Sequence, residues 1–179
     1  MLERLLVTGA AGGVANLIRP RLSGLSKRFR LTDIRHVVSA SDSDEIMVGD
    51  LADSAFVDRL VQDCDGVLHL GGVSTEQSFE EIMPANIVGV YNIYRAAAKC
   101  DRPRVIFASS NHVVGAYGTQ EIITPNEPFL PDSFYGASKV FGEAIAKLFF
   151  VKEGVESAIV RIGSCFDQPS DLRMMSTWF

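Results

Sequence analysis

The stretch Leu5–Ala15 reads LLVTGAAGGVA and predicts a short strand, a tight turn and the start of a helix. Three consecutive apolar residues at its start are typical of a strand buried on both faces, as in a parallel sheet. The glycines and alanines of the turn let backbone N–H groups approach a phosphate at the positive end of a helix. The stretch therefore predicts a pyrophosphate cradle that includes Gly9, Gly12, Gly13 and Val14, although a tight turn without a ligand has the same pattern.

An acidic residue follows the next predicted strand, Phe29–Thr32, which comes after a helix predicted over Val14–Leu22. This residue, Asp33, lies 21 positions after the second glycine of the turn. A spacing of about 20 is expected of the carboxylate that binds the adenosine ribose of a dinucleotide. We therefore predict that Asp33 and the adjacent Ile34 contact NAD. A carboxylate at this position repels the 2′-phosphate of NADP and therefore favours NAD. The nearby cation Arg35 leaves NADP as an alternative cofactor.

Length and composition are those of one ordinary globular domain. Of the 179 residues, 47% are hydrophobic and 22% are charged, and the net charge of −5 argues against a broad nucleic-acid surface. Three widely spaced cysteines suggest neither a disulfide framework nor a zinc site. The N-terminus does not resemble a signal peptide, and no stretch approaches the roughly 20 apolar residues of a membrane span. We expect a cytoplasmic protein with no membrane or nucleic-acid partner.

Strands and helices alternate along the rest of the chain. The apolar pattern predicts further strands over Ile46–Val48, Gly66–Leu70, Val105–Ala108 and Ser157–Ile162. It predicts further helices over Ser54–Gln62 and Glu80–Lys99, and a last helix that contains Tyr135 and Lys139 and ends at about Glu153. This alternation predicts an α/β fold, a Rossmann-like doubly wound parallel sheet with helices on both faces. No linker or repeat interrupts it, so we expect residues 1–179 to form a single NAD-binding domain.

Residues at the ends of the third and fourth strands are predicted to contact the nucleotide, because a doubly wound sheet binds its ligand at the carboxyl ends of its strands. Asp50, beside Leu51, is predicted either to bond the adenine amino group or to cap the next helix. A second glycine pair follows the fourth strand and again allows close backbone approach, and we predict that it lies beside the first turn. The residues of this second turn are Leu70, Gly71 and Gly72.

Two further polar residues have more than one interpretation. His69 lies within a strand that looks buried, and we interpret it as a structural histidine rather than a ligand. Asn86, in the predicted helix over Glu80–Lys99, either supports the active site from beneath or is an ordinary exposed side chain.

Four polar residues in succession follow the fifth predicted strand. They are Ser109, Ser110, Asn111 and His112. Such a run is costly to bury in a core and natural at a reaction site on the ligand edge of the sheet. The sequence therefore predicts the reaction site here, and predicts the long segment 110–132 as a substrate-side flap.

Tyr135 and Lys139 are spaced as an acid–base pair. Four positions apart, they share one face of a helix. A nearby ammonium group favours the phenolate, so we expect the pKa of Tyr135 to fall from about 10 toward that of a useful base.

These motifs together resemble the extended short-chain dehydrogenase/reductase superfamily over essentially the whole chain. The shared features are TGxxGxxA at 8–15, with alanine at the usual third glycine, Asp33, Asp50, Ser110, the Tyr135/Lys139 pair and RIG at 161–163. Within the superfamily, four further stretches closely resemble the uronate dehydrogenases: HLGG at 69–72, FASSNH at 107–112, VRIGSC at 160–165 and RMxSTWF at 173–179. The resemblance implies NAD-dependent oxidation of galacturonate or glucuronate to the aldarolactone.

The resemblance also implies roles for individual residues. Tyr135 is the base, Lys139 holds the ribose and assists it, and Ser110 orients the reacting hydroxyl. Arg173 takes the substrate carboxylate, which a planar guanidinium binds through two parallel hydrogen bonds. The other implied substrate contacts are Ser74, Asn111 and His112. The other implied cofactor contacts are Ser109, Ile162 and Ser164, together with Tyr135 itself.

Enzymes of this family continue beyond the end of this sequence. We therefore interpret the chain as lacking the family's C-terminal part, and 164–179 as a second substrate-side segment. Two other functions stay open: a sugar-nucleotide epimerase or dehydratase, and a truncated, non-catalytic NAD-binding domain. The resemblance further implies a homo-oligomer formed through the helices near Glu80 and Tyr135.

Overall fold

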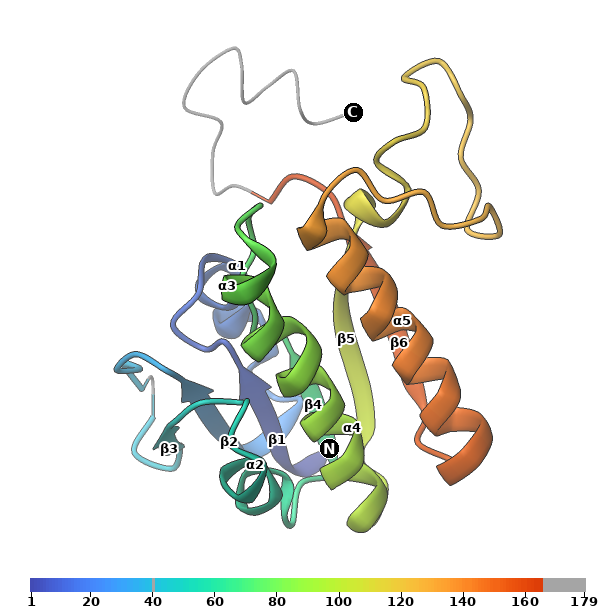
Figure 1. Ribbon diagram of the computed structural model, residues 1–179. Coiled ribbons are helices and arrows are strands. Elements are labelled where there is room, and N and C mark those ends of the chain that lie inside the picture. The colour runs from blue at the N-terminus through green and yellow to red at the C-terminus, as the bar shows by residue number, and fades with distance from the viewer. Residues whose placement is uncertain (40, 166–179) are drawn as a thin grey trace.

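A parallel sheet forms the centre of the computed structural model, which describes residues 1–39 and 41–165 (Figure 1). Within these residues the sheet has six strands in the order β3-β2-β1-β4-β5-β6, and all neighbouring pairs are parallel. This is the doubly wound order, with its switch point between β1 and β4, so the predicted fold class is confirmed. The strands are β1 (Leu2–Thr8), β2 (Ser26–Asp33), β3 (Glu45–Val48), β4 (Gly66–His69), β5 (Arg104–Ser110) and β6 (Ser157–Ile162).

Helices cover both faces of the sheet. One core layer packs α2, α4 and α5 against one face, and a second layer packs α1 and η1 against the other (Figure 1). No helix in the described part of the chain is long and apolar enough to cross a membrane. The helices are α1 (Gly13–Ile18), η1 (Arg19–Leu22), α2 (Ser54–Val61), α3 (Phe79–Met83), η2 (Pro84–Gly89), α4 (Val90–Lys99), η3 (Asn111–Val114) and α5 (Phe134–Glu153).

Prolines explain two differences from the predicted helices. The first helix stops at Ile18 and continues as the 3-10 turn η1, which contains Pro20. The long helix begins as α3, and its middle section, η2, is a π-helix that starts at Pro84. Proline has no N–H for the regular hydrogen bond and crowds the preceding turn, so the helical pattern changes at both positions.

The predicted fifth strand is longer than expected. β5 runs through both serines of the polar run, and they pair in register with Arg161 and Ile162 of β6. Both serines are buried. The polar run therefore begins inside the sheet, and only Asn111 and His112 lie beyond the strand in η3.

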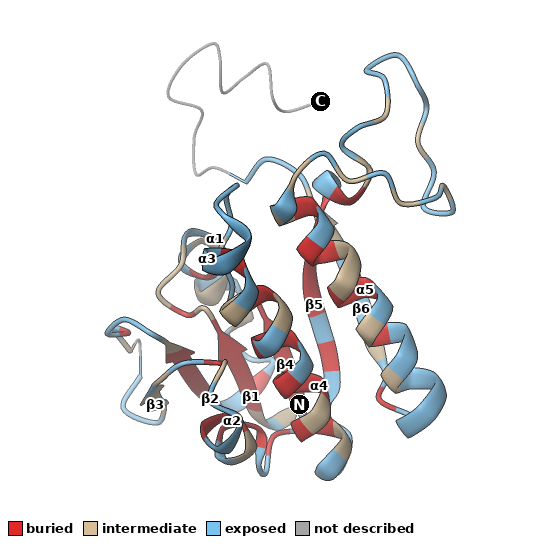
Figure 2. Ribbon diagram, in the orientation of Figure 1, coloured by how far each residue is buried: buried red, intermediate tan, exposed pale blue. Residues whose placement is uncertain are grey.

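Burial along β5 and β6 is one-sided in the described residues (Figure 2). Val105 and Phe107 face α4 and α5 and are buried. On the opposite face Ile106 is 40% exposed and Val160 is 47% exposed. By contrast, Leu6 and Val7 are both fully buried, so β1 is covered on both faces.

Candidate active site

Two glycine turns pack backbone against backbone at the switch point. Gly9 has φ +65°, a conformation that side chains disfavour, and a Cβ there would lie 2.8 Å from the Cα of Gly71. The N–H of Gly12 donates to the carbonyl of Gly9 at 2.9 Å and closes the first turn. The prediction that the two turns lie side by side is confirmed, and α1 begins at Gly13 with its N–H groups at this edge.

A buried side-chain pair joins these turns. The Thr8 hydroxyl lies 2.7 Å from Nδ1 of His69 and accepts the N–H of Gly71 at 2.9 Å. His69 is 1% exposed, and burial, together with the charge of Lys139, lowers its pKa to about 3. The ring is therefore neutral, and the interpretation of His69 as a structural residue is confirmed.

The predicted adenosine side lies at the ends of β2 and β3. An oxygen of Asp33 accepts the Ala11 N–H at 3.1 Å, which places the carboxylate beside the first turn. Arg35 connects Asp33 to the first turn. Its backbone N–H donates to the Asp33 carboxylate at 3.0 Å, and its guanidinium donates to the Ala11 carbonyl at 3.0 Å. Ile34 is exposed next to them. The carboxylate, the cation and an apolar surface thus lie together at the turn.

The cap role considered for Asp50 is wrong. Asp53 caps α2, because its carboxylate accepts the N–H groups of Ala55 and Phe56 at 2.9 and 3.1 Å. The Asp50 carboxylate instead accepts the Ala52 N–H at 2.8 Å and is exposed. The adenine contact predicted for Asp50 stays a prediction. Leu51 is buried in the core, so its side chain supports the second glycine turn from below.

The lysine of the acid–base pair is deeply buried. Lys139 is 7% exposed, and its Nζ donates to the Ala108 carbonyl at 3.0 Å. Nζ lies 5.6 Å from the centroid of the Tyr135 ring, so the two side chains share a helix face as predicted. Burial lowers the pKa of Lys139 to about 8.

The expected lowering of the Tyr135 pKa is wrong for this structure. Burial raises the pKa of Tyr135 above its ordinary value, and a hydrogen bond with Ser110 offsets only part of that effect. The ammonium of Lys139 is directed to a backbone carbonyl rather than to the phenol. The sequence shows the spacing of Tyr135 and Lys139, but the burial that raises the pKa of Tyr135 follows only from the fold.

A carboxylate from a distant loop holds the start of α5. The side chain of Glu76 accepts the N–H groups of Phe134 and Tyr135 at 3.0 and 2.8 Å. Ser133 caps the same helix by accepting the N–H of Gly136 at 3.0 Å. Helix N-termini favour negative charge, so Glu76 stabilises the helix that carries the tyrosine. No sequence signal links it to a position 58 residues away.

Glu143 is a second residue that the sequence analysis missed. It lies one helical turn beyond Lys139 and is 3% exposed. Its carboxylate accepts the Ser109 hydroxyl at 2.6 Å and two guanidinium N–H groups of Arg161 at 2.9 and 3.0 Å. Burial raises its pKa, but these bonds hold that pKa below its ordinary value. The Glu143–Arg161 ion pair joins α5 to β6, and the hydrogen bond from the Ser109 hydroxyl joins the same carboxylate to β5.

The Asn86 side chain supports the site from beneath. It is buried, accepts the Val73 N–H at 2.8 Å and donates to the Val73 carbonyl at 3.0 Å and to Ser138 Oγ at 2.9 Å. It therefore fixes the loop that leads from the second glycine turn to Ser74, and the supporting role is confirmed.

Most of the predicted site residues lie at the same edge of the sheet. Val14 follows the first turn, Leu70 and Gly72 lie in the second, and Ser74 is exposed beyond it. Asn111 and His112 follow β5, Ile162 is the last residue of β6, and Ser164 lies two positions after it. Arg173 lies outside the described residues.

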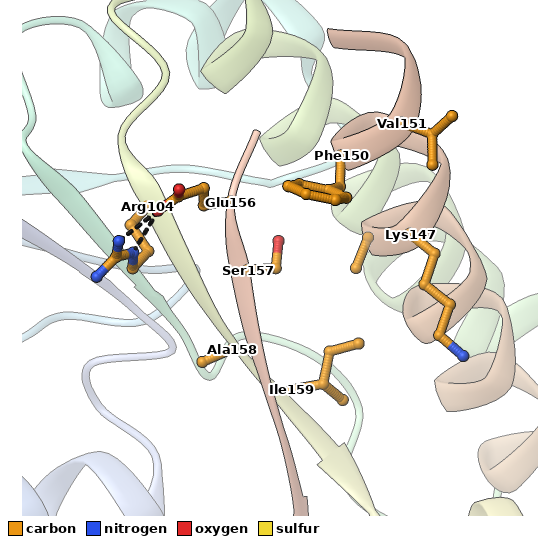
Figure 3. Close-up of a pocket in the computed structure, with 9 residues that line it drawn as sticks. Arg104, Lys147, Phe150, Val151, Glu156, Ser157, Ala158 and Ile159 are labelled. Atoms are coloured by element: carbon orange, nitrogen blue, oxygen red, sulfur yellow. Dashed lines mark hydrogen bonds and ion pairs between the residues drawn. The ribbon is translucent and has the colours of Figure 1, made fainter. Parts of the chain in front are cut away.

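A separate cavity of about 730 Å³ lies between α5 and β6 (Figure 3). Its lining includes Phe150 and Ser157, near the end of α5 and the start of β6, and none of the predicted residues.

The edge fits a dinucleotide beside a sugar-sized substrate. A turn of glycine and alanine precedes the N-terminus of α1, and an acid lies at the predicted ribose position beside it. Ser110, Tyr135 and Lys139 meet at the end of β5. A hydroxyl placed between Ser110 and Tyr135 can lose its proton to the phenol oxygen while its carbon loses hydride.

Comparisons with known proteins agree with this geometry. The model of the NAD dependent epimerase/dehydratase family matches residues 5–169. A uronate dehydrogenase of Pseudomonas syringae pv. tomato is 51% identical over 98% of this chain and 64% of its own length. The solved glucuronic acid dehydrogenase of Chromohalobacter salexigens is 52% identical, with TM-score 0.94 over 99% of this chain and 67% of that chain.

An NAD complex is also among the similar structures. It is a variant of the Agrobacterium tumefaciens uronate dehydrogenase, 47% identical, with TM-score 0.92 over 99% of this chain and 67% of that chain. The present chain spans about two thirds of the length of these relatives. The predicted resemblance to uronate dehydrogenases is confirmed, and with it NAD as the family's cofactor. The chain belongs to the NAD dependent epimerase/dehydratase family.

Proposed function

We propose that this chain oxidises a hexuronic acid, galacturonate or glucuronate, at the anomeric carbon with NAD and forms the aldarolactone. The observation that carries the proposal is the meeting of Ser110, Tyr135 and Lys139 beside two glycine turns. The similarity to uronate dehydrogenases over nearly the whole chain supports the substrate class.

The residues at the edge divide the chemistry between them. When bound, NAD supplies the hydride acceptor and becomes NADH. Tyr135, as the phenolate, takes the proton of the anomeric hydroxyl while the anomeric carbon gives up its hydride, so that carbon becomes the lactone carbonyl. Ser110 donates a hydrogen bond to the same oxygen as it becomes a carbonyl. The ring form reacts directly, and no water enters this step.

Lys139 and the turns hold the reactants. The Lys139 ammonium, anchored on the Ala108 carbonyl, is proposed to bond the ribose and to assist Tyr135 as the base. The proposed nucleotide contacts are Gly9, Gly12, Gly13, Val14, Asp33, Ile34, Asp50, Leu51, Leu70, Gly71, Gly72, Ser109, Ile162 and Ser164.

Substrate recognition is proposed to come from exposed residues at the same edge. Ser74, Asn111 and His112 are exposed there and carry groups that bond sugar hydroxyls. Arg173 is proposed to bind the carboxylate, because a guanidinium makes paired hydrogen bonds with it.

NADH absorbance with NAD and either hexuronate at about neutral pH tests the proposal, beside NAD binding by calorimetry. Turnover of either acid supports it, and Tyr135→Phe is the matched control. Protection by UDP- or dTDP-sugars in a thermal shift assay, without protection by hexuronates, would favour a sugar-nucleotide epimerase or dehydratase. NAD binding without turnover of any of these compounds would indicate a non-catalytic NAD-binding domain.

We also propose a homo-oligomer that pairs the outer faces of α3, α4 and α5. Phe79, Tyr91, Phe134 and Leu148 are large apolar side chains exposed on these helices. Light scattering during size-exclusion chromatography tests this, and a monomer at high concentration would contradict it. The cytoplasmic location stays a prediction.

A further inference from the structure

The His112 imidazole is fixed by a carboxylate from the far end of the flap. His112 lies in η3, directly after β5, whereas Asp132 is the residue before the cap of α5. Nδ1 of His112 lies 2.9 Å from both oxygens of Asp132. The pair therefore closes the segment between them at its base.

Asp132 is itself held in place. Its Oδ1 accepts the Ser133 hydroxyl at 2.7 Å, and a Cβ at Gly115 would lie 2.1 Å from Oδ2, so only glycine lets the carboxylate reach this position. Burial raises the pKa of Asp132, but hydrogen bonds from Ser133 and His112 hold it below its ordinary value. At neutral pH this group is a carboxylate and can only accept hydrogen bonds.

This acceptor determines which ring nitrogen carries the proton. Nδ1 must donate to Asp132, so the neutral ring leaves Nε2 as a hydrogen-bond acceptor. Within residues 1–39 and 41–165 Nε2 has no protein partner. The His112 ring packs edge-on against the Tyr135 ring, with centroids 5.5 Å apart. The ring that carries Nε2 is thus next to the proposed base.

We propose that Asp132 is a positioning residue that holds His112 in the Nδ1–H tautomer, so that Nε2 accepts a hydrogen bond from a substrate hydroxyl beside Tyr135. The substrate contact rests on the proposed function, whereas the tautomer does not. Asp132 touches neither substrate nor cofactor and acts only through His112.

Long-range ¹H–¹⁵N correlation NMR tests the tautomer without any substrate. The chain has three histidines, so His112→Ala assigns the relevant signals. At about pH 8 we expect His112 as the Nδ1–H form, because the Asp132 carboxylate can only accept a hydrogen bond from Nδ1. Asp132→Ala should shift its signals toward the Nε2–H form. His69 is the internal control: Thr8 accepts from Gly71 and donates to Nδ1, so His69 stays Nε2–H in every variant. An Nε2–H form of wild-type His112, or no shift in Asp132→Ala, would overturn the proposal.

A double-mutant cycle tests the contact with substrate. Asp132→Ala should raise KM for the hexuronate about 10-fold, the size seen when the partner of a functional histidine is lost, and should leave NAD affinity within about twofold. In the His112→Ala background the same change should add less than about twofold. Asp53→Ala is the control, because it removes the cap of α2 and lowers Tm but removes no contact of His112 or Asp132. Equal effects of Asp132→Ala in both backgrounds would overturn the proposal. If the wild type oxidises no hexuronate, the proposed function fails while the NMR result still decides the tautomer.

Discussion

Two histidines show how differently the two halves of the site are built. His69, on the nucleotide side, is buried and accepts a hydrogen bond from Thr8, which also contacts the second glycine turn. His112, on the catalytic side, is half-exposed and pairs with a carboxylate 20 residues away. The nucleotide half depends on the absence of side chains, and the catalytic half depends on long-range pairs between side chains. A change of shape should damage the first half, and a change of charge or proton position should damage the second.

Tyr135→Phe should separate the halves most strongly. Losing the base removes a contribution of about 10²–10⁴ to the rate, so we expect kcat to fall about 10³-fold. NAD affinity should stay within about threefold, because the glycine turns are untouched. Stopped-flow NADH formation and calorimetry measure the two effects, and turnover within tenfold of wild type would show that another group is the base.

Gly9→Ala should damage the nucleotide half through shape alone. The new Cβ would contact Gly71 at 2.8 Å from a residue with φ +65°, so we expect a loss of about 2 kcal/mol in unfolding free energy and of NAD binding. Gly13→Ala is the matched control, because its Cβ would meet nothing within 4 Å. Urea denaturation compares them, and equal stability of the two variants would contradict the backbone account.

The pH dependence of stability should report the buried histidine. Burial lowers the His69 pKa to about 3, so the unfolded chain binds its proton more readily and stability falls as pH drops below about 6.5. His69→Asn keeps an acceptor for Thr8 but does not titrate. Between pH 6.5 and 5 its stability curve should be flatter by at most about 1.4 kcal/mol per pH unit. Parallel curves for variant and wild type would show that His69 is not buried in the neutral form.

Glu76→Gln should have the smallest effect of these changes. Glutamine keeps an acceptor for only one of the two α5 N–H groups and loses the charge, so we expect a loss of about 1 kcal/mol in unfolding free energy and a slightly lower Tm. Glu153→Gln, at the other end of the same helix, should act in the opposite direction. Calorimetric scans compare the two variants, and shifts of the same sign would contradict the helix-charge explanation.

The two halves also differ in how far the sequence predicts them. The glycine turns and the Tyr135/Lys139 pair are local patterns, and the structure brings them together. Glu76, Asp132 and Glu143 each bond a partner between 18 and 59 positions away, and spacing alone does not select such pairs. Only Glu143 had a signal in the sequence, because it lies one helical turn beyond Lys139. The Tyr135 pKa was mispredicted because burial is a tertiary property. Of the two alternatives for Asp50, the cap is wrong because Asp53 lies nearer the helix start.

Hydride transfer from the anomeric carbon is the central claim, and isotopic labelling tests it most directly. The protein is incubated with NAD and glucuronate or galacturonate deuterated at C1, and the products are analysed by NMR and mass spectrometry. We expect the reduced nicotinamide to carry the deuterium and the sugar product to be the aldarolactone, with neither product formed by Tyr135→Phe. Reduced nicotinamide without deuterium, or no reduction by a folded protein that binds NAD, would contradict the account.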